Sequence, residues 1–198
     1  ITGEYSTVCG GQQNTTYNSY AFIGGGIGHL IYGSESTIGG GNGNVTRARY
    51  GTIAGGQSSV VWDTNGFIGG GGSNGATGQY STIAGGNSNK TNANYGTIGG
   101  GNGNVTLDQY GTIAGGQSNV AWDTNSFIGG GQSNGATGLG SVIAGGTSNT
   151  TQSALCTISG GTVNSAAGQS STVSGGQQNG ATGLAATVGG GRQNSITG

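Results

Sequence analysis

One apolar position recurs along the chain at a fixed interval. An aliphatic residue stands two places before a Gly-Gly pair in 13 successive units, and each unit begins 15 residues after the previous one. Thr usually precedes the aliphatic residue and small residues surround it, which is typical of a short β-strand. The Gly pair then predicts a corner, and the Asn-containing stretch after it predicts a turn. The aliphatic residues are Val8, Ile23, Ile38, Ile53, Ile68, Ile83, Ile98, Ile113, Ile128, Ile143, Ile158, Val173 and Val188.

A strict period without insertions predicts a solenoid, because each coil of a solenoid stacks its side chains on the same columns of the next coil. Helical repeats need about 33 residues or more per unit, so a unit of 15 residues favours strands. We therefore expect an all-β fold, a parallel β-solenoid (β-roll) of 13 coils that forms one domain over residues 1–198. Each coil contains a short strand, a Gly-Gly corner, a second extended segment such as 45–46 or 105–106, and a closing turn.

The columns have different expected roles. The aliphatic residues should point inward, whereas the preceding Thr and a Tyr two places before that Thr should lie on the opposite face of the strand. Three residues after each Gly pair an Asn is usual, and we interpret this column as an internal amide ladder between coils. The ladder residues are Asn14, Asn44, Asn74, Asn89, Asn104, Asn119, Asn134, Asn149, Asn164, Asn179 and Asn194.

Glycosylation is the alternative role for part of this column. Five of its residues lie in N-x-T sequons, namely Asn14, Asn44, Asn89, Asn104 and Asn149. An internal column would make these sequons a by-product of Asn followed by a strand Thr.

The aromatic residues are candidates for an interface or a ligand site. One buried Ile or Val per coil contributes about 1.5–3 kcal/mol, whereas ordering each residue costs about 1–2 kcal/mol. The core of a coil is therefore thin, and we expect the Tyr, Thr and Phe side chains to be buried against other copies of the chain, most simply in a three-fold bundle. The Tyr and Phe candidates are Tyr50, Tyr80, Tyr95, Tyr110, Phe67 and Phe127.

A longer repeat lies above the 15-residue period. Residues 35–94 and 95–154 align without gaps, which indicates a duplication of four coils. Each copy contains a Trp-Asp pair, Trp62-Asp63 and Trp122-Asp123, followed by Thr-Asn. Two interpretations stay open: a Trp that covers a turn initiated by the Asp, or an exposed aromatic-plus-acid site for a sugar.

Composition narrows the function classes. Of 198 residues 51 are Gly, none is Pro, and four cations and five acids give a net charge of −1. So few cations argue against nucleic-acid binding, and no apolar run approaches the roughly 18 residues of a membrane span. The only histidine, His29, replaces a ladder Asn, and no carboxylate pair falls within a coil. We expect no enzyme activity, metal or cofactor, and we expect Cys9 and Cys156 to be buried thiols too far apart for a disulfide.

Two runs suggest a family. The segments YSTIAGGNSN at 80–89 and YGTIAGGQSN at 110–119 resemble the Gly-Gly-x-x-Asn repeats of bacterial and phage surface fibres. They are also similar to the head of trimeric autotransporter adhesins, a left-handed parallel β-roll whose unit is usually 14 residues long. The resemblance implies left-handed coils in this chain too. It also implies a homotrimer on a cell or virion surface that adheres to host surfaces, matrix or surface glycans.

Two other functions remain as alternatives. Open solenoid ends are unpaired strand edges, so a subunit could stack end to end into an extracellular filament. The run STVSGGQQN at 171–179 is similar to the repeats of grass ice-binding proteins, and a regular Thr column would suit an ice face. The Phe residues at 22, 67 and 127 interrupt that column.

Overall fold

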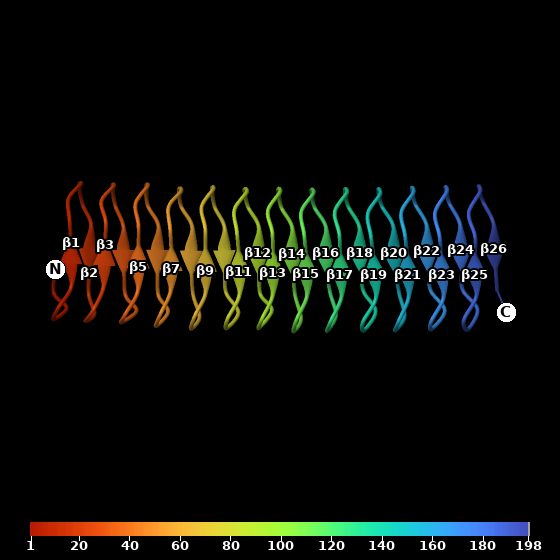
Figure 1. Cartoon of the computed structure of the whole chain (residues 1–198), viewed down its shortest axis with the longest axis horizontal. Coiled ribbons are helices and arrows are strands. Elements are labelled where there is room, and N and C mark those ends of the chain that lie inside the picture. Colours follow the sequence, from red (N-terminus) through yellow and green to blue (C-terminus); the bar gives the residue numbers. More distant parts are fainter. Residues whose placement is uncertain (198) are drawn as a thin grey trace. The chain divides into compact units, whose positions relative to one another are not determined.

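Every regular element of the protein is a β-strand of two residues. The computed structural model describes residues 1–197, and within them it contains 26 such strands and no helix. The chain divides into two compact units, residues 1–101 and residues 102–198. Both units repeat the same coil, in which an odd-numbered strand is followed by a corner, an even-numbered strand and a turn (Figure 1).

The first unit contains strands β1 to β13. Its odd-numbered strands are β1 (Thr7–Val8), β3 (Phe22–Ile23), β5 (Thr37–Ile38), β7 (Thr52–Ile53), β9 (Phe67–Ile68), β11 (Thr82–Ile83) and β13 (Thr97–Ile98). Its even-numbered strands are β2 (Thr15–Thr16), β4 (Leu30–Ile31), β6 (Val45–Thr46), β8 (Val60–Val61), β10 (Gly75–Ala76) and β12 (Lys90–Thr91).

The second unit contains strands β14 to β26. Its even-numbered strands are β14 (Val105–Thr106), β16 (Val120–Ala121), β18 (Gly135–Ala136), β20 (Thr150–Thr151), β22 (Ser165–Ala166), β24 (Gly180–Ala181) and β26 (Ser195–Ile196). Its odd-numbered strands are β15 (Thr112–Ile113), β17 (Phe127–Ile128), β19 (Val142–Ile143), β21 (Thr157–Ile158), β23 (Thr172–Val173) and β25 (Thr187–Val188).

All strands pair in parallel with the strand one coil away. In each unit the odd-numbered strands form one sheet, here the first sheet, and the even-numbered strands form the second sheet. The register joins residues 15 apart, as in the pairs Thr52↔Phe67 and Ile53↔Ile68. The prediction of an all-β, parallel β-solenoid with a 15-residue period is confirmed. The handedness and the single domain over 1–198 stay predictions.

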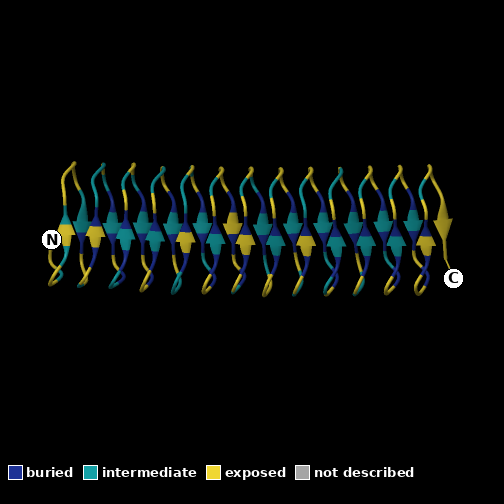
Figure 2. Ribbon diagram, in the orientation of Figure 1, coloured by how far each residue is buried: buried dark blue, intermediate teal, exposed yellow. Residues whose placement is uncertain are grey.

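Side chains alternate between the interior and the surface along each strand. The second residue of a strand points inward, so Ile53 and Val61 are fully buried, while the residues before them are only partly covered. Two further inward positions complete each coil, one before the first strand and one before the second, as Gly51 and Ser59 illustrate. Figure 2 shows this alternation as buried segments between more exposed strand residues.

The corners and turns depend on residues with positive φ. In the coil of Ile53 the second corner glycine, Gly56, has φ 96°, and a side chain on it would overlap the carbonyl oxygen of Gly71 in the next coil. Tyr50 and Ser58 have φ 59° and 54°, which is the left-handed region that few non-Gly residues adopt. The prediction that Tyr50 shares the first strand with Thr52 is therefore wrong, because the chain turns at Tyr50 before the strand begins.

Candidate functional site

The interior columns explain most of the repeated residues. All the aliphatic residues from Ile23 to Val188 are buried, and Val8 in the first coil is partly covered. The opposite inner wall comes from the second residues of the even-numbered strands, which are small or β-branched, such as Thr46, Val61 and Ala76. The coil interior is thus narrow, and its apolar part is one aliphatic side chain facing one smaller side chain.

The Asn column lies inside the coils and bonds to backbone groups. Asn134 is typical: its Oδ1 accepts from the backbone N–H of Asn149 in the next coil at 3.0 Å. Its Nδ2 donates to the carbonyl of Gly130 at 3.0 Å and to that of Gly146 at 2.9 Å. The ladder residues from Asn44 to Asn179 therefore lie in the interior, whereas Asn14 is half-buried and Asn194 is exposed. Amides such as that of Asn134 link corner carbonyls of two coils, and Asn194 differs because its Nδ2 donates to the Oδ1 of Asn179 at 3.2 Å.

This arrangement leaves no room for a glycan on the buried sequons. Asn44, Asn89, Asn104 and Asn149 are fully buried, and the Nδ2 of Asn44, for example, donates to the carbonyls of Gly40 and Gly56. In the folded chain these amides are therefore structural.

His29 takes the place of a ladder Asn and copies half of its bonding. Its Nδ1 accepts from the backbone N–H of Asn44 at 3.1 Å. Its Nε2 is buried and makes no hydrogen bond of normal geometry. The nearby Gly41 carbonyl favours the protonated ring and so acts to raise the pKa of His29. Burial outweighs this effect and lowers the pKa of His29. The side chain is fully buried, so it has no access to a substrate.

The Tyr residues lie on the outer turns. Tyr50, Tyr80, Tyr95 and Tyr110 are between 42% and 50% exposed and all have positive φ. The rings of Tyr80 and Tyr95 stack with centroids 5.2 Å apart. They are surface residues of the isolated chain, which is compatible with either predicted role.

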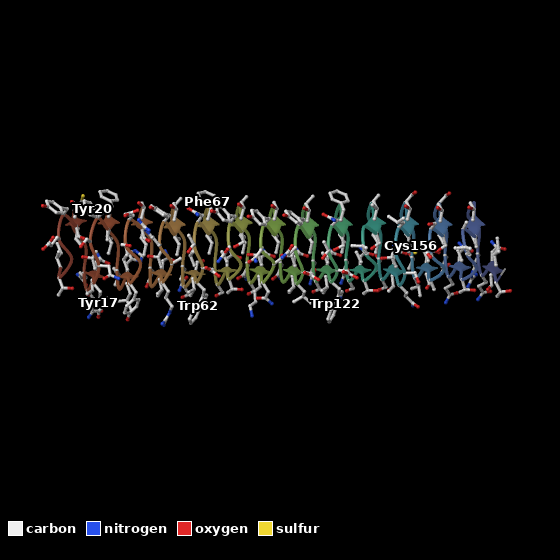
Figure 3. All side chains as sticks on the ribbon, turned by 90° about the horizontal axis from the view of Figure 1, so that it is seen from below. Tyr17, Tyr20, Trp62, Phe67, Trp122 and Cys156 are labelled. Atoms are coloured by element: carbon white, nitrogen blue, oxygen red, sulfur yellow. The ribbon has the colours of Figure 1, made fainter. Side chains whose placement is uncertain are left out.

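The Phe residues lie on the outer face of the first sheet. Phe67 and Phe127 are the first residues of β9 and β17 and are each 39% exposed. Figure 3 labels Phe67 and Tyr20 on one side of the first unit, and Trp62 and Tyr17 on the opposite side.

The two Trp-Asp pairs adopt the same turn but have different neighbours. Trp62 and Trp122 are 51% and 53% exposed. In both copies the Asp Oδ1 accepts from the N–H of the following Thr at 2.7 Å, one residue earlier than the N–H that an Asx-turn uses. The guanidinium carbon of Arg47 lies 4.4 Å from the centroid of the Trp62 ring. The corresponding residue beside Trp122 is Leu107.

Sequence reasoning missed the residues that surround Trp62. Arg47 also lies over Tyr32, with its guanidinium carbon 5.3 Å from the ring centroid. Tyr32 in turn stacks on Tyr17, with centroids 4.7 Å apart and ring planes at 6°. All four residues occupy the position just after an even-numbered strand. A search of that column for aromatic residues would have found Tyr17 and Tyr32, but not Arg47.

No family model matches the chain, and a search of curated proteins gives no significant match. Residues 1–197 contain no group of three His, Cys, Asp or Glu side chains that could hold a metal ion. The same residues contain no helix that could cross a bilayer.

The two cysteines differ in exposure. Cys156 is buried, and its Sγ lies 3.0 Å from the carbonyl oxygen of Gly168. Cys9 is exposed, so the prediction of a buried thiol is wrong there. Cys9 follows β1 at a position that points outward, where other coils have Gly, Ala or Ser.

Proposed function

We propose that the chain is a non-enzymatic, extracellular β-solenoid domain of a surface fibre. It forms a homotrimer through the outer face of the first sheet, and its exposed aromatic residues contact a surface or matrix ligand. The resemblance of its repeats to those of surface fibres supports this proposal. The structural observation that supports it most is the composition of the first-sheet face.

The first-sheet face consists of the first residue of each odd-numbered strand and the residue that follows each of these strands. The first set contains only Thr, Phe and Val, and the second only Gly, Ala, Ser and Cys. Neither set contains a charged or amide side chain, although Asn and Gln are frequent elsewhere in the chain. A sheet face without charged side chains can pack against another sheet, and the cores of interfaces are depleted in charge.

The narrow interior gives a reason for association. Most coils bury one aliphatic residue of the first sheet and one Thr or Ala of the second sheet, while exposed rings such as Phe22 and Phe67 remain on the first-sheet face. Burying such a ring contributes roughly 1.5–3 kcal/mol. Association through this face would therefore supply apolar burial that a single coil lacks.

The oligomeric state of the purified chain tests the proposal. Sedimentation velocity and light scattering should give a discrete trimer. Phe67→Glu should yield monomers with an unchanged circular dichroism spectrum, because the Phe67 ring points away from the core and a buried unpaired charge is costly in an interface. Gln57→Glu is the matched control, because Gln57 is exposed and lies outside the first-sheet face; this variant should remain trimeric.

The alternatives give different results. A wild-type chain that is monomeric at all concentrations would overturn the trimer. Rods whose length grows with concentration would instead support the end-to-end filament.

Ice binding is a second candidate, favoured by one stretch of the same face. Thr157, Thr172 and Thr187 begin β21, β23 and β25 in register, and the small residues Ser159 and Ser174 lie beside them. No aromatic ring interrupts these three coils on the face. Thermal hysteresis of the purified chain, lost in Thr172→Lys, would support this function; a chain without hysteresis would exclude it.

A further inference from the structure

A stacked column of four side chains distinguishes one part of the second sheet. Tyr17, Tyr32, Arg47 and Trp62 follow β2, β4, β6 and β8, and we call them the Tyr17–Trp62 ladder. The guanidinium of Arg47 lies between the rings of Tyr32 and Trp62, at 5.3 Å and 4.4 Å from their centroids. Cation–π contacts at these distances hold an arginine in a defined orientation.

The ladder leaves one group of atoms free to bind. Neighbouring side chains cover one another's inner faces. All four side chains remain exposed to solvent, so the N–H groups of Arg47 and the hydroxyls of Tyr17 and Tyr32 can reach a ligand. Among the described residues Arg47 has no ion-pair partner. Arg49, two residues later, donates to Glu35 at 3.0 Å. Arg47 is therefore an oriented cation whose charge is not neutralised.

We propose that the Tyr17–Trp62 ladder binds an acidic polysaccharide. The N–H groups of Arg47 donate to carboxylate or sulfate oxygens of the sugar chain, which match the planar donor set of a guanidinium. The tyrosine hydroxyls and the indole N–H of Trp62 bond to neighbouring sugar oxygens. The inference deepens the proposed adhesive function, on which it rests for its biological meaning, because it names the class of ligand.

The geometry favours this ligand over two others. A neutral sugar that stacks on an aromatic residue needs an open ring face. Tyr32 lies between Tyr17 and Arg47, with its ring centroid 4.7 Å from that of Tyr17 and 5.3 Å from the guanidinium carbon, and Arg47 also lies over the Trp62 ring. Nucleic acid requires several cations on successive phosphates, whereas the ladder has one cation and the whole chain has a net charge of −1. A ligand with separated anionic groups and many hydroxyls satisfies both restrictions.

The duplicated copy provides an internal control. Trp122 is exposed and has the same Asp-Thr-Asn turn as Trp62. In that copy Leu107 stands where Arg47 would be, and Asp108 follows it. The second Trp therefore has a similar position but no cation beside it, and we expect it not to bind the anionic ligand.

Binding of the full chain to immobilised polysaccharides tests the inference. The probes are polygalacturonate, which carries carboxylates, dextran sulfate, which carries sulfates, and unmodified dextran, which is neutral. We expect binding to one or both acidic probes, weakened about tenfold or more by Arg47→Gln and also weakened by Trp62→Ala. The matched controls Arg49→Gln and Trp122→Ala should change the affinity less than about twofold.

Three outcomes would overturn the proposal. They are an absence of binding to both acidic probes, equal losses in Arg47→Gln and Arg49→Gln, and equal binding to unmodified dextran. Polyglutamate serves as a polyanion without sugar hydroxyls, and binding to it as tight as to the acidic polysaccharides would indicate an acidic protein partner instead. Circular dichroism verifies that each variant is folded. Binding is measured separately from sedimentation. A monomeric chain that binds would therefore contradict the proposed trimer but support the ligand site.

Discussion

The ladder amides show why a single residue type dominates an interior column. Each position needs one acceptor for the N–H of the next coil and donors for two corner carbonyls, as Asn134 illustrates. A primary amide provides both within one short side chain. Asp would lack the donors and bring a buried charge, and Gln would be one methylene too long. Ser59, which replaces Asn in one coil, still accepts from the N–H of Asn74 at 3.2 Å.

Replacing one of these amides should be costly. Asn134→Ala removes three hydrogen bonds and leaves the N–H of Asn149 and the carbonyl of Gly130 without this partner, while the Gly146 carbonyl still accepts from the N–H of Gln132. We expect a loss of about 3 kcal/mol in the free energy of unfolding. Urea denaturation followed by circular dichroism measures this loss. Gln132→Ala, on an exposed side chain of the same coil, should stay within about 0.5 kcal/mol of the wild type. Equal stability of the two variants would contradict the role assigned to the ladder.

His29 makes the same column sensitive to pH. Burial holds its pKa below the ordinary value of 6.5, so the unfolded chain binds a proton more readily than the folded chain. The contribution of neutral His29 to folding stability is therefore fully present above about pH 6.5, and it is lost progressively as the pH falls below that value. Nδ1 accepts from the N–H of Asn44. A proton on Nδ1 would therefore point at that N–H, and this hydrogen bond would be lost.

A pair of melting curves checks this behaviour. The wild-type melting temperature should be lower at pH 5 than at pH 8, and His29→Asn should remove most of the difference, because His29 is the only histidine and carboxylates titrate at lower pH. An equally large pH dependence in His29→Asn would show that another group is responsible.

At the scale of elements, the two corner glycines have different tasks. Gly56 has φ 96°, and a Cβ on it would overlap the carbonyl oxygen of Gly71, whereas a Cβ on Gly55 meets nothing within 4 Å. Only the second glycine of the pair allows the next coil to approach. The first provides backbone freedom at a site with open space around it.

Matched alanine substitutions separate these tasks. Gly56→Ala forces the coils apart and places an alanine at an unfavourable φ. The torsion alone costs about 1–3 kcal/mol, and the overlap adds to it, so we expect the free energy of unfolding to fall by several kcal/mol. Gly55→Ala should change the free energy of unfolding by less than about 1 kcal/mol. Chemical denaturation of both variants gives the comparison, and a similar loss in both would contradict it.

The sequence predicts which residues stack in columns better than it predicts the path of the backbone. The 15-residue period identifies which residues stack, because stacking requires equal spacing, and Ile53 and Asn134 lie where the period places them. The turn at Tyr50 could not be read from the pattern, because a Tyr two places before a strand Thr looks like strand alternation and rarely has positive φ. Arg47 was missed because a cation between two rings depends on side-chain orientation, which spacing does not determine.

At the scale of the whole molecule, the equal length of the coils is the main constraint. Paired strands join residues 15 apart, as in Gly135↔Thr150 and Ala136↔Thr151. Removing residues 136–150 therefore takes out one coil and restores the pattern at the junction. Removing residues 136–149 leaves one coil of 16 residues, in which the inward and outward positions no longer alternate correctly.

These two deletions should behave differently although they differ by one residue. The 15-residue deletion should keep the circular dichroism spectrum and cooperative melting, with a small decrease in melting temperature, because only one set of neighbour contacts is lost. The 14-residue deletion should melt at a clearly lower temperature. Similar melting of both would mean that the coils tolerate a bulge and that register is not the constraint.

Interior contacts that repeat from coil to coil also affect how such a protein can change over evolutionary time. In the two aligned four-coil segments the inward Ile residues of the first sheet are the same, while other buried places differ in detail, as Ser59 and Asn119 do. Interior packing does not restrict the outward places. Arg47 and Leu107 occupy equivalent outward places in the two copies, beside Trp62 and Trp122. A copied set of coils thus presents a second surface on the same kind of interior. The outward residues of one copy can change their binding specificity while those of the other copy keep theirs.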